Sequence, residues 1–209
     1  DEDNILKDFN LELEPNKKIA IVGSSGQGKS TLFNLITRIF DPNKGEIDID
    51  GINIKDLTEE DLRKNISIIR QEPFVFNRTI KENFKIINDK ITLSKIRECT
   101  KLAYLDDYIM SLPKKYDTVL GEGGVNLSGG QKQRLLILCC MMKEPEIIFL
   151  DEPTAYLDDE NRRRMRKIIY DLCYKYHKTV VIASHDLGML EIADKHYHIE
   201  NQQILLKKN

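Results

Sequence analysis

A short apolar run followed by a glycine-rich loop constrains the fold of this chain more than any other feature. Residues 18–22 predict a buried parallel strand, and residues 29–39 predict the helix that follows it. Between them lies the string Gly23-Ser24-Ser25-Gly26-Gln27-Gly28-Lys29-Ser30-Thr31. In such a strand, loop and helix, glycines let backbone N–H groups converge on an anion at the helix N-terminus. The unit therefore predicts a site for nucleotide phosphates.

Three kinds of group in this loop are expected to bind the ligand. Lys29 should reach the β- and γ-phosphates, Ser30 should ligate Mg²⁺, and backbone N–H groups of residues 26–31 should hold the β-phosphate. A glycine-rich turn with an incidental lysine is the plainer alternative. It does not explain why Lys-Ser-Thr follows the glycines at this spacing.

The rest of the chain alternates strands with helices, which favours an α/β fold with a parallel-sheet core of the P-loop type. Alternating residues around Asp50-Gly51 predict a hairpin and an antiparallel β edge, and Asn16 stands where a turn needs the left-handed conformation. The apolar spacing from residue 80 to residue 110 is helical, so we expect one domain with a helical subdomain at about residues 78–140. Further buried strands are predicted at residues 67–69, 147–150 and 179–183.

The charge of the chain does not favour a nucleic-acid-binding protein. The net charge is −2 and charges of both signs are interspersed, so a nucleic-acid partner is not expected. The densest basic run, residues 162–167, lies on a predicted amphipathic helix and is interpreted as a solvent-exposed face.

The longest apolar run, residues 135–142, is far short of the roughly 20 residues of a membrane-spanning helix. Four cysteines without a C-x-x-C spacing fit a reducing cytosol.

Two acidic residues follow the strand predicted at residues 147–150. The carboxyl end of a parallel strand beside a phosphate loop is where an acid can face the ligand. We therefore expect Asp151 to hold Mg²⁺ through water and Glu152 to polarise the water that attacks the γ-phosphate. An acidic pair after a strand is usually only a helix cap, and it is the phosphate loop that favours catalysis here.

A second glycine-containing string, Leu127-Ser128-Gly129-Gly130-Gln131, is expected to begin a helix. Ser128 is a good N-cap, and the two glycines let backbone N–H groups approach a phosphate. The string resembles the signature sequence of ATP-binding cassette (ABC) ATPases, and the resemblance extends over nearly the whole chain. It implies that Gln71 is the Q-loop glutamine that senses Mg²⁺ and the γ-phosphate, that Asp158 is the D-loop aspartate, and that His185 is the switch histidine. His196 and His198 match no motif and are interpreted as structural.

Further segments resemble those of ABC exporters. Residues 116–124 are similar to the segment before the signature, in which a glutamate, here Glu122, touches transmembrane domains, and residues 76–83 are similar to the segment after the Q-loop. Phe74 and Phe76 would be an apolar docking patch or residues that cover the core.

The chain also departs from the exporter pattern. Pro153 and Tyr156 stand where exporters usually carry alanines, and Cys139-Cys140 replaces a common arginine-alanine pair. Family members usually stack adenine on an aromatic residue that would lie upstream of Asp1. We therefore expect the strand that carries this aromatic residue to be missing.

The resemblance implies the nucleotide-binding domain of an ABC transporter, of exporter type, that uses Mg²⁺ and ATP. Its partners would be transmembrane domains and a second nucleotide-binding domain, and it would lie on the cytoplasmic side of a membrane. In a head-to-tail pair, Ser128, Gly130 and Gln131 of one copy would close on the γ-phosphate held by the other. One alternative is a soluble ABC ATPase of DNA repair or translation, although coiled-coil inserts, paired cassettes and basic surfaces are not evident. Another is a regulatory module that binds ATP without hydrolysis, against which Glu152 and His185 argue.

Overall fold

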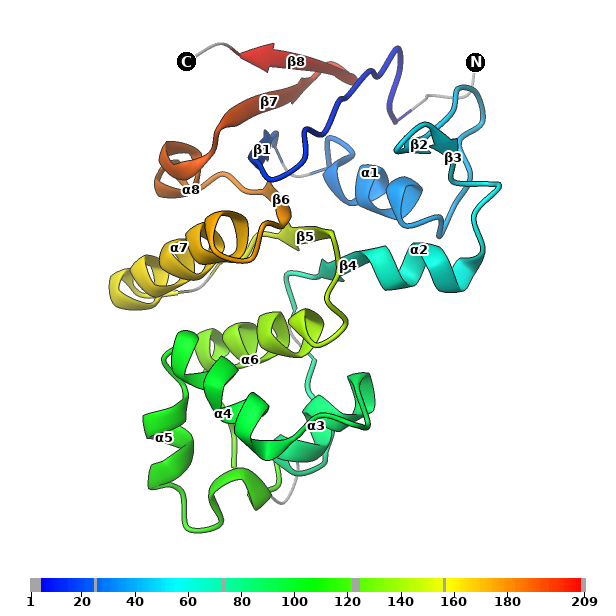
Figure 1. The fold of residues 1–209 in the computed structure, drawn as a ribbon. Coiled ribbons are helices and arrows are strands. Elements are labelled where there is room, and N and C mark those ends of the chain that lie inside the picture. Colours follow the sequence, from blue (N-terminus) through cyan, green and yellow to red (C-terminus); the bar gives the residue numbers. More distant parts are fainter. Residues whose placement is uncertain (1–4, 25, 73, 122–124, 156, 208–209) are drawn as a thin grey trace. The chain divides into compact units, whose positions relative to one another are not determined.

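The computed structural model describes residues 5–24, 26–72, 74–121, 125–155 and 157–207. The chain forms two compact units, which we call the sheet unit and the helical unit (Figure 1). The sheet unit comprises Asp1–Ile68, Pro145–Glu152 and Ile169–Asn209, and the helical unit comprises Ile69–Glu144 and Pro153–Ile168.

A mostly parallel six-stranded sheet is the centre of the sheet unit, with the strand order β4-β5-β6-β1-β7-β8. Strand β1 pairs in parallel with β6 and β7, and β5 pairs in parallel with β6. This arrangement confirms the predicted α/β fold with a parallel core. The strands are β1 (Lys18–Val22), β4 (Ile66–Ile69), β5 (Ile147–Asp151), β6 (Thr179–Ala183), β7 (Lys195–Glu200) and β8 (Gln203–Lys207). The helices of this unit are α1 (Lys29–Ile36), α2 (Glu59–Asn65) and α8 (Leu187–Ile192).

The core of the sheet unit forms because its central strands are apolar on both faces. All residues of β6 are buried, and α1 packs Phe33 against Phe149 of β5 with ring centroids 5.0 Å apart. Helix α1 ends at Ile36, three residues before the predicted end at residue 39. The reason is local: Arg38 adopts a φ of 54°, and the Ile39 N–H donates to the Asn34 carbonyl, which closes a C-terminal cap.

Two predicted turns take the backbone conformations that their residues favour. Asn16 has a φ of 58°, and Asp50 and Gly51 have φ values of 51° and 76°. The latter turn joins β2 (Asp48–Ile49) to β3 (Ile52–Asn53), which confirms the predicted hairpin. The hairpin is a separate two-stranded sheet, and the antiparallel strand at the edge of the main sheet is β8, which pairs with β7.

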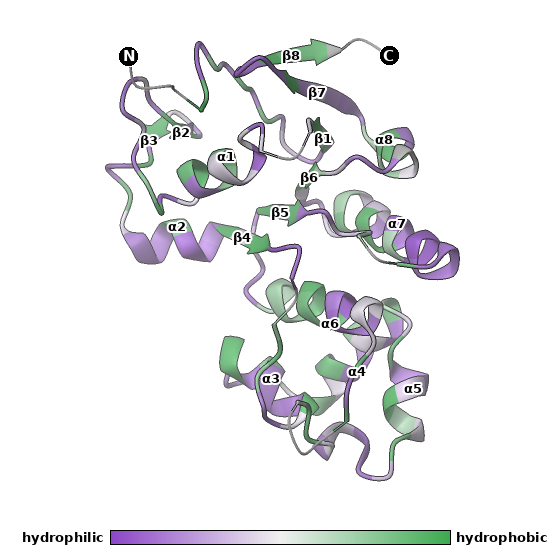
Figure 2. Ribbon diagram, turned by 180° about the vertical axis from the view of Figure 1, so that it is seen from behind, coloured by the Kyte–Doolittle hydropathy of each residue, from purple (hydrophilic) through white to green (hydrophobic). Residues whose placement is uncertain are grey.

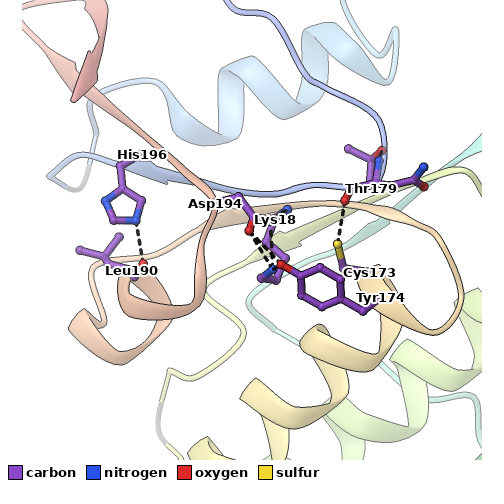
Figure 3. Close-up of polar contacts among 8 residues, drawn as sticks. Lys18, Cys173, Tyr174, Thr179, Leu190, Asp194 and His196 are labelled. Carbon is purple, nitrogen blue, oxygen red and sulfur yellow. Dashed lines mark hydrogen bonds and ion pairs between the residues drawn. The ribbon is translucent and has the colours of Figure 1, made fainter. Parts of the chain in front are cut away.

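A buried lysine anchors the start of β1 (Figure 3). The Lys18 side chain is 2% exposed, and its Nζ donates to the Tyr174 hydroxyl at 2.7 Å and lies 3.0 Å from Asp194 Oδ2. The Lys18 backbone N–H also donates to this carboxylate, at 2.7 Å. Burial alone would lower the pKa of Lys18, but the bonds to Tyr174 and Asp194 raise it above its ordinary value. These contacts tie β1 to the segment that enters β7.

The helical unit contains the stretch that sequence spacing predicts to be helical. This stretch is divided into α3 (Ile80–Ile87), α4 (Leu93–Leu102) and α5 (Asp106–Ser111), and it is followed by a 3₁₀ turn (Lys115–Asp117) and α6 (Gly129–Met141). A buried polar network joins these elements: the Tyr116 hydroxyl donates to Asp106 Oδ1 at 2.6 Å, and Arg97 donates to the same carboxylate. Within the described ranges, no helix combines the length and the apolar character that crossing a bilayer requires.

Helix α7 (Asp159–Tyr174) begins in the helical unit and ends in the sheet unit. Figure 2 shows hydrophilic residues along its first turns and along α2. Its buried apolar residues are Met165, Ile168, Ile169, Leu172 and Cys173. Tyr170 and Tyr174 are about half exposed, and within the basic run Arg163 and Lys167 are exposed, so the predicted amphipathic helix is confirmed.

Candidate nucleotide-binding site

The glycine-rich loop joins β1 to α1 in the sheet unit, as predicted. Gly26 and Gly28 have φ values of 83° and 96°, a region that residues with side chains rarely adopt. At Gly28 a Cβ would also lie 2.8 Å from Leu6 Cδ2, so the Leu6 side chain would have to shift, but it is the backbone conformation that requires glycine. Because Gly28 is the N-cap of α1, no side chain of the cap residue occupies the first N–H groups of the helix. These N–H groups remain suited to an anion.

The Lys29 side chain is curled into the loop and is buried. Its Nζ donates to the Gly23 carbonyl and, at 3.2 Å, to the Ser24 carbonyl. Gln27 closes the same turn, because its Oε1 accepts a hydrogen bond from the Ser24 N–H at 3.0 Å. The ammonium is therefore held within the loop, where an anion bound by the backbone would meet it. Ser25, a predicted ligand, lies outside the described residues.

Two of the residues predicted to bind Mg²⁺ face each other. The Ser30 hydroxyl donates to Asp151 Oδ2 at 3.4 Å, and Asp151 is buried at the end of β5. A hydroxyl and a carboxylate are hard oxygen ligands of the kind that Mg²⁺ prefers, so this pair fits the metal. Gln71, the third predicted ligand, belongs to the helical unit and is exposed there, and its role stays a prediction.

Glu152 and His185 are brought together by strand pairing. In the β5–β6 ladder Asp151 is opposite Ala183, so the residues that follow each strand are neighbours. His185 Nδ1 lies 2.9 Å from Glu152 Oε1. The backbone of Glu152 has a φ of 48°, and its N–H donates to the Ala183 carbonyl at 2.8 Å. The carboxylate is 11% exposed and the imidazole 79% exposed, so a sheltered carboxylate lies next to an accessible imidazole.

A third residue of this group, Ser184, was not predicted from the sequence. The Ser184 hydroxyl donates to the other oxygen of Glu152, Oε2, at 3.3 Å. Its position directly before the predicted switch histidine was the only available signal.

In the helical unit, the signature string begins α6 as predicted. Ser128 Oγ accepts the Gln131 N–H at 3.3 Å, and Gln131 Oε1 accepts the Ser128 N–H at 2.9 Å, which forms a capping box. A Cβ at Gly130 would lie 3.1 Å from Leu157 Cδ2 and 3.2 Å from Asn161 Cγ. Gly130 therefore lets the start of α6 approach the segment around Asp158 closely.

Asp158 caps the start of α7. Its Oδ1 accepts the Asn161 N–H and its Oδ2 accepts the Asn161 side-chain amide, both at 2.8 Å. These bonds, the backbone bond most of all, lower the pKa of Asp158 below its usual range. Asn161 Oδ1 in turn accepts a hydrogen bond from Arg134, a buried residue of α6. The Arg134–Asn161 bridge links the predicted signature helix to the predicted D-loop, and neither residue was predicted from the sequence.

The remaining predicted residues have separate outcomes. Phe74 and Phe76 are 68% and 44% exposed, and their rings meet edge to face with centroids 5.2 Å apart, so they do not belong to the core. The half-buried His196 bonds through Nε2 to the Leu190 carbonyl at 2.7 Å, which agrees with a structural role (Figure 3). Glu122 and Tyr156 lie outside the described residues.

Comparison with known proteins agrees with the geometry of the loop and the signature. The profile of the ABC transporter family matches residues 6–155, a range that includes the phosphate loop, the signature string and Glu152. The chain belongs to the ABC transporter family. Within this family it is an ATP-binding ATPase domain.

Several ABC proteins are similar to the chain. A putative multidrug export ATP-binding/permease protein of Staphylococcus aureus is 44% identical over 201 residues, which are 96% of this chain and 34% of that protein. ABC transporter B family member 2 of Dictyostelium discoideum is 40% identical over 191 residues, which are 91% of this chain and 14% of that protein. The structure of a bacterial Atm1-family ABC exporter with ATP bound has a TM-score of 0.88 at 34% identity, and the match covers 98% of this chain and 36% of that one. The chain thus spans about a third or less of the length of these relatives.

Proposed function

We propose that this ABC domain binds ATP with Mg²⁺ at residues 23–31, hydrolyses it, and powers transport across a membrane. One observation carries the proposal: the sheltered carboxylate of Glu152, bonded to His185, follows the same strand end as Asp151, which contacts Ser30 of the phosphate loop. The proposed phosphate ligands, metal ligands and general base would thus lie together at one edge of the sheet, as expected for ATP hydrolysis at the carboxyl ends of parallel strands.

Each residue has a definite task in this proposal. Backbone N–H groups of the loop and the Lys29 ammonium bind the β- and γ-phosphates. Ser30, Asp151 and Gln71 would hold Mg²⁺, which neutralises charge on the phosphates when bound. Glu152 accepts the proton of the attacking water, and His185 orients that carboxylate through the bond between Nδ1 and Oε1.

The site is completed by a second copy in this proposal. Ser128, Gly129, Gly130 and Gln131 of one domain would face the γ-phosphate held by the other, together with Asp158 of the D-loop. The capping box engages the N–H groups of Ser128 and Gln131, and a Cβ at Gly129 would meet nothing within 4 Å. The open space around Gly129 lets a ligand from outside approach the start of α6 closely, which supports a composite site.

Transmembrane domains are the further partners that we propose, on the same chain or another, with the ABC domain on the cytoplasmic side of the membrane. The support is that two of the relatives are named as exporters and are about three times as long as the matched region. The exposed Phe74 and Phe76, close to Gln71 in sequence, are suited to contact such a partner. We take residues 1–209 as one domain with a helical subdomain at about residues 78–140.

Substitution of Glu152 by glutamine tests the catalytic part of the proposal. Glutamine keeps the shape of the side chain but is not a base, so turnover should fall by about 10²-fold or more while ATP binding is retained. ATP-bound dimers should accumulate in gel filtration. Glu191→Gln, an exposed substitution in the same unit, is the matched control and should keep normal turnover. Normal turnover of Glu152→Gln would contradict the proposal.

A further inference from the structure

We propose that Ser184 is a positioning residue for Glu152, an inference that rests on the proposed role of Glu152 as general base. Two consecutive residues hold the two oxygens of this carboxylate. His185 Nδ1 lies 2.9 Å from Oε1, and Ser184 Oγ donates to Oε2 at 3.3 Å. Within the part of the chain that the structure describes, Ser184 and His185 are thus the two side chains that bind this carboxylate.

The direction of the serine hydrogen bond follows from its other partner. Ser184 Oγ accepts the Asp186 N–H at 3.1 Å. A hydroxyl has one hydrogen, and an N–H group can only donate to it, so that hydrogen is available to the Glu152 carboxylate. Hydrogen bonds to a carboxylate are stronger than those between neutral groups. The orientation of the Ser184 hydroxyl is therefore fixed by two partners: the Glu152 carboxylate accepts its hydrogen, and the Asp186 N–H donates to its oxygen.

Ser184 and His185 differ in how firmly they are held. Ser184 is 1% exposed, whereas the His185 side chain is 79% exposed. The Ser184 N–H also donates to the carbonyl of Ile21 in β1, the strand that leads into the phosphate loop. Ser184 therefore connects Glu152 to the backbone that carries the phosphate ligands, and it can keep the base at a constant place relative to the loop.

The backbone of Glu152 makes this support important. A φ of 48° is uncommon for a residue with a long side chain, and the Ala183 carbonyl holds the Glu152 N–H. The carboxylate leaves the strand end from an unusual direction, and the side chains that bind it there belong to the residues directly after β6. Ser184, directly after Ala183 in sequence, supplies that contact.

Three substitutions of Ser184 separate its hydroxyl from its volume. We expect Ser184→Ala to lower kcat about five- to twentyfold, because a mispositioned general base accepts the proton of the attacking water less efficiently. The KM for ATP should change less than twofold. Ser184→Cys nearly keeps the volume but is a weak donor, and it should lose most of the same rate. Ser184→Thr retains the hydroxyl and should recover at least half of the normal kcat.

The matched control is Ser67→Ala in β4. Ser67 is also buried, at 5% exposure, and among the described residues its hydroxyl has no hydrogen-bond partner. This variant should keep kcat within twofold of the parent. Thermal unfolding followed by circular dichroism would show whether each variant is folded at the assay temperature.

Combination with Glu152→Gln tests whether Ser184 acts through Glu152. Adding Ser184→Ala to Glu152→Gln should change the residual turnover less than twofold, because the base is already lost. An unchanged kcat in the folded Ser184→Ala and Ser184→Cys variants would overturn the inference. So would an equal loss of rate in the Glu152→Gln background. Normal turnover of Glu152→Gln alone would instead overturn the proposed function, so the two failures are distinguishable.

Discussion

The imidazole of His185 contacts the carboxylate of Glu152 at 2.9 Å, although 33 residues separate them in sequence. The contact exists because β5 and β6 are parallel neighbours with Asp151 opposite Ala183, so both strands end at the same place. Glu152 is sheltered and His185 is exposed. The imidazole of His185 is therefore open to the surroundings, while the carboxylate of Glu152 is screened from bulk water.

Replacement of His185 by alanine removes the partner of Glu152 Oε1. We expect kcat to fall about tenfold or more, because the general base Glu152 loses a side chain that orients it, whereas ATP binding changes little. Steady-state turnover and equilibrium ATP binding would be measured. His177→Asn is a suitable control, because His177 is exposed and has a φ of 53°, which asparagine tolerates. Equal turnover of His185→Ala and the control would contradict the role of His185.

The composite site predicts complementation between two inactive variants. Lys29→Ala damages the phosphate loop and Ser128→Arg damages the signature, so each variant alone should be nearly inactive. A mixed dimer has one site with both halves damaged and one with both halves intact. Mixing should therefore restore part of the activity, and the rate should rise faster than linearly with concentration while dimers are scarce.

Cross-linking would show whether mixed dimers form in that experiment. No recovery in the presence of mixed dimers would count against independent composite sites. Full activity of Ser128→Arg alone, linear in protein concentration, would show that the signature takes no part in the reaction.

The Lys18–Asp194 pair predicts a stability that depends on pH. Burial raises the pKa of Asp194, but hydrogen bonds from Lys18 and Tyr174 outweigh this effect and lower it below its ordinary value. A lowered folded-state pKa stabilises the fold above the unfolded-state value of about 4, and this contribution disappears as pH falls through the folded-state pKa. Asp194→Asn should cost about 1–3 kcal/mol of unfolding free energy at neutral pH, since Lys18 would lose its charged partner.

Urea denaturation at several pH values would measure this effect. The difference between the parent and Asp194→Asn should shrink as pH is lowered from 7 towards 3. Glu98→Gln removes an exposed ion pair with Lys95 and should change the unfolding free energy by less than about 0.5 kcal/mol. A difference between the parent and Asp194→Asn that is constant over this range would mean that the carboxylate charge does not stabilise the fold.

The bridge from Arg134 to Asn161 predicts coupling between α6 and the start of α7. Arg134 is 2% exposed, and burial lowers its pKa, so loss of its acceptor leaves a poorly solvated cation. Asn161→Ala should destabilise the domain by about 1–3 kcal/mol. In a double-mutant cycle with Arg134→Met, the second substitution should cost less when Asn161 is already absent. Additive effects on the free energy of unfolding would show that the bridge stabilises nothing.

The sequence alone determined the features that depend on neighbouring residues. The phosphate loop, the Asp50-Gly51 hairpin and the N-cap at Ser128 follow from glycine, aspartate and serine at positions where the backbone needs them. The buried strands followed from short apolar runs, which predict burial on both faces. The alternation of these elements was sufficient to predict the α/β class, and the motif order was sufficient to identify the family.

Only the tertiary structure decided which distant residues meet. The pairing of β5 with β6 brings Ser184 to Glu152, the packing of α6 brings Arg134 to Asn161, and a hydrogen-bonded cluster closes on Lys18. No local pattern identifies the partners of these residues, because a serine, an arginine or a lysine at such positions is compatible with many environments. Their partners depend on strand order and register, which result from the packing of the whole core and not from the residues beside them in sequence.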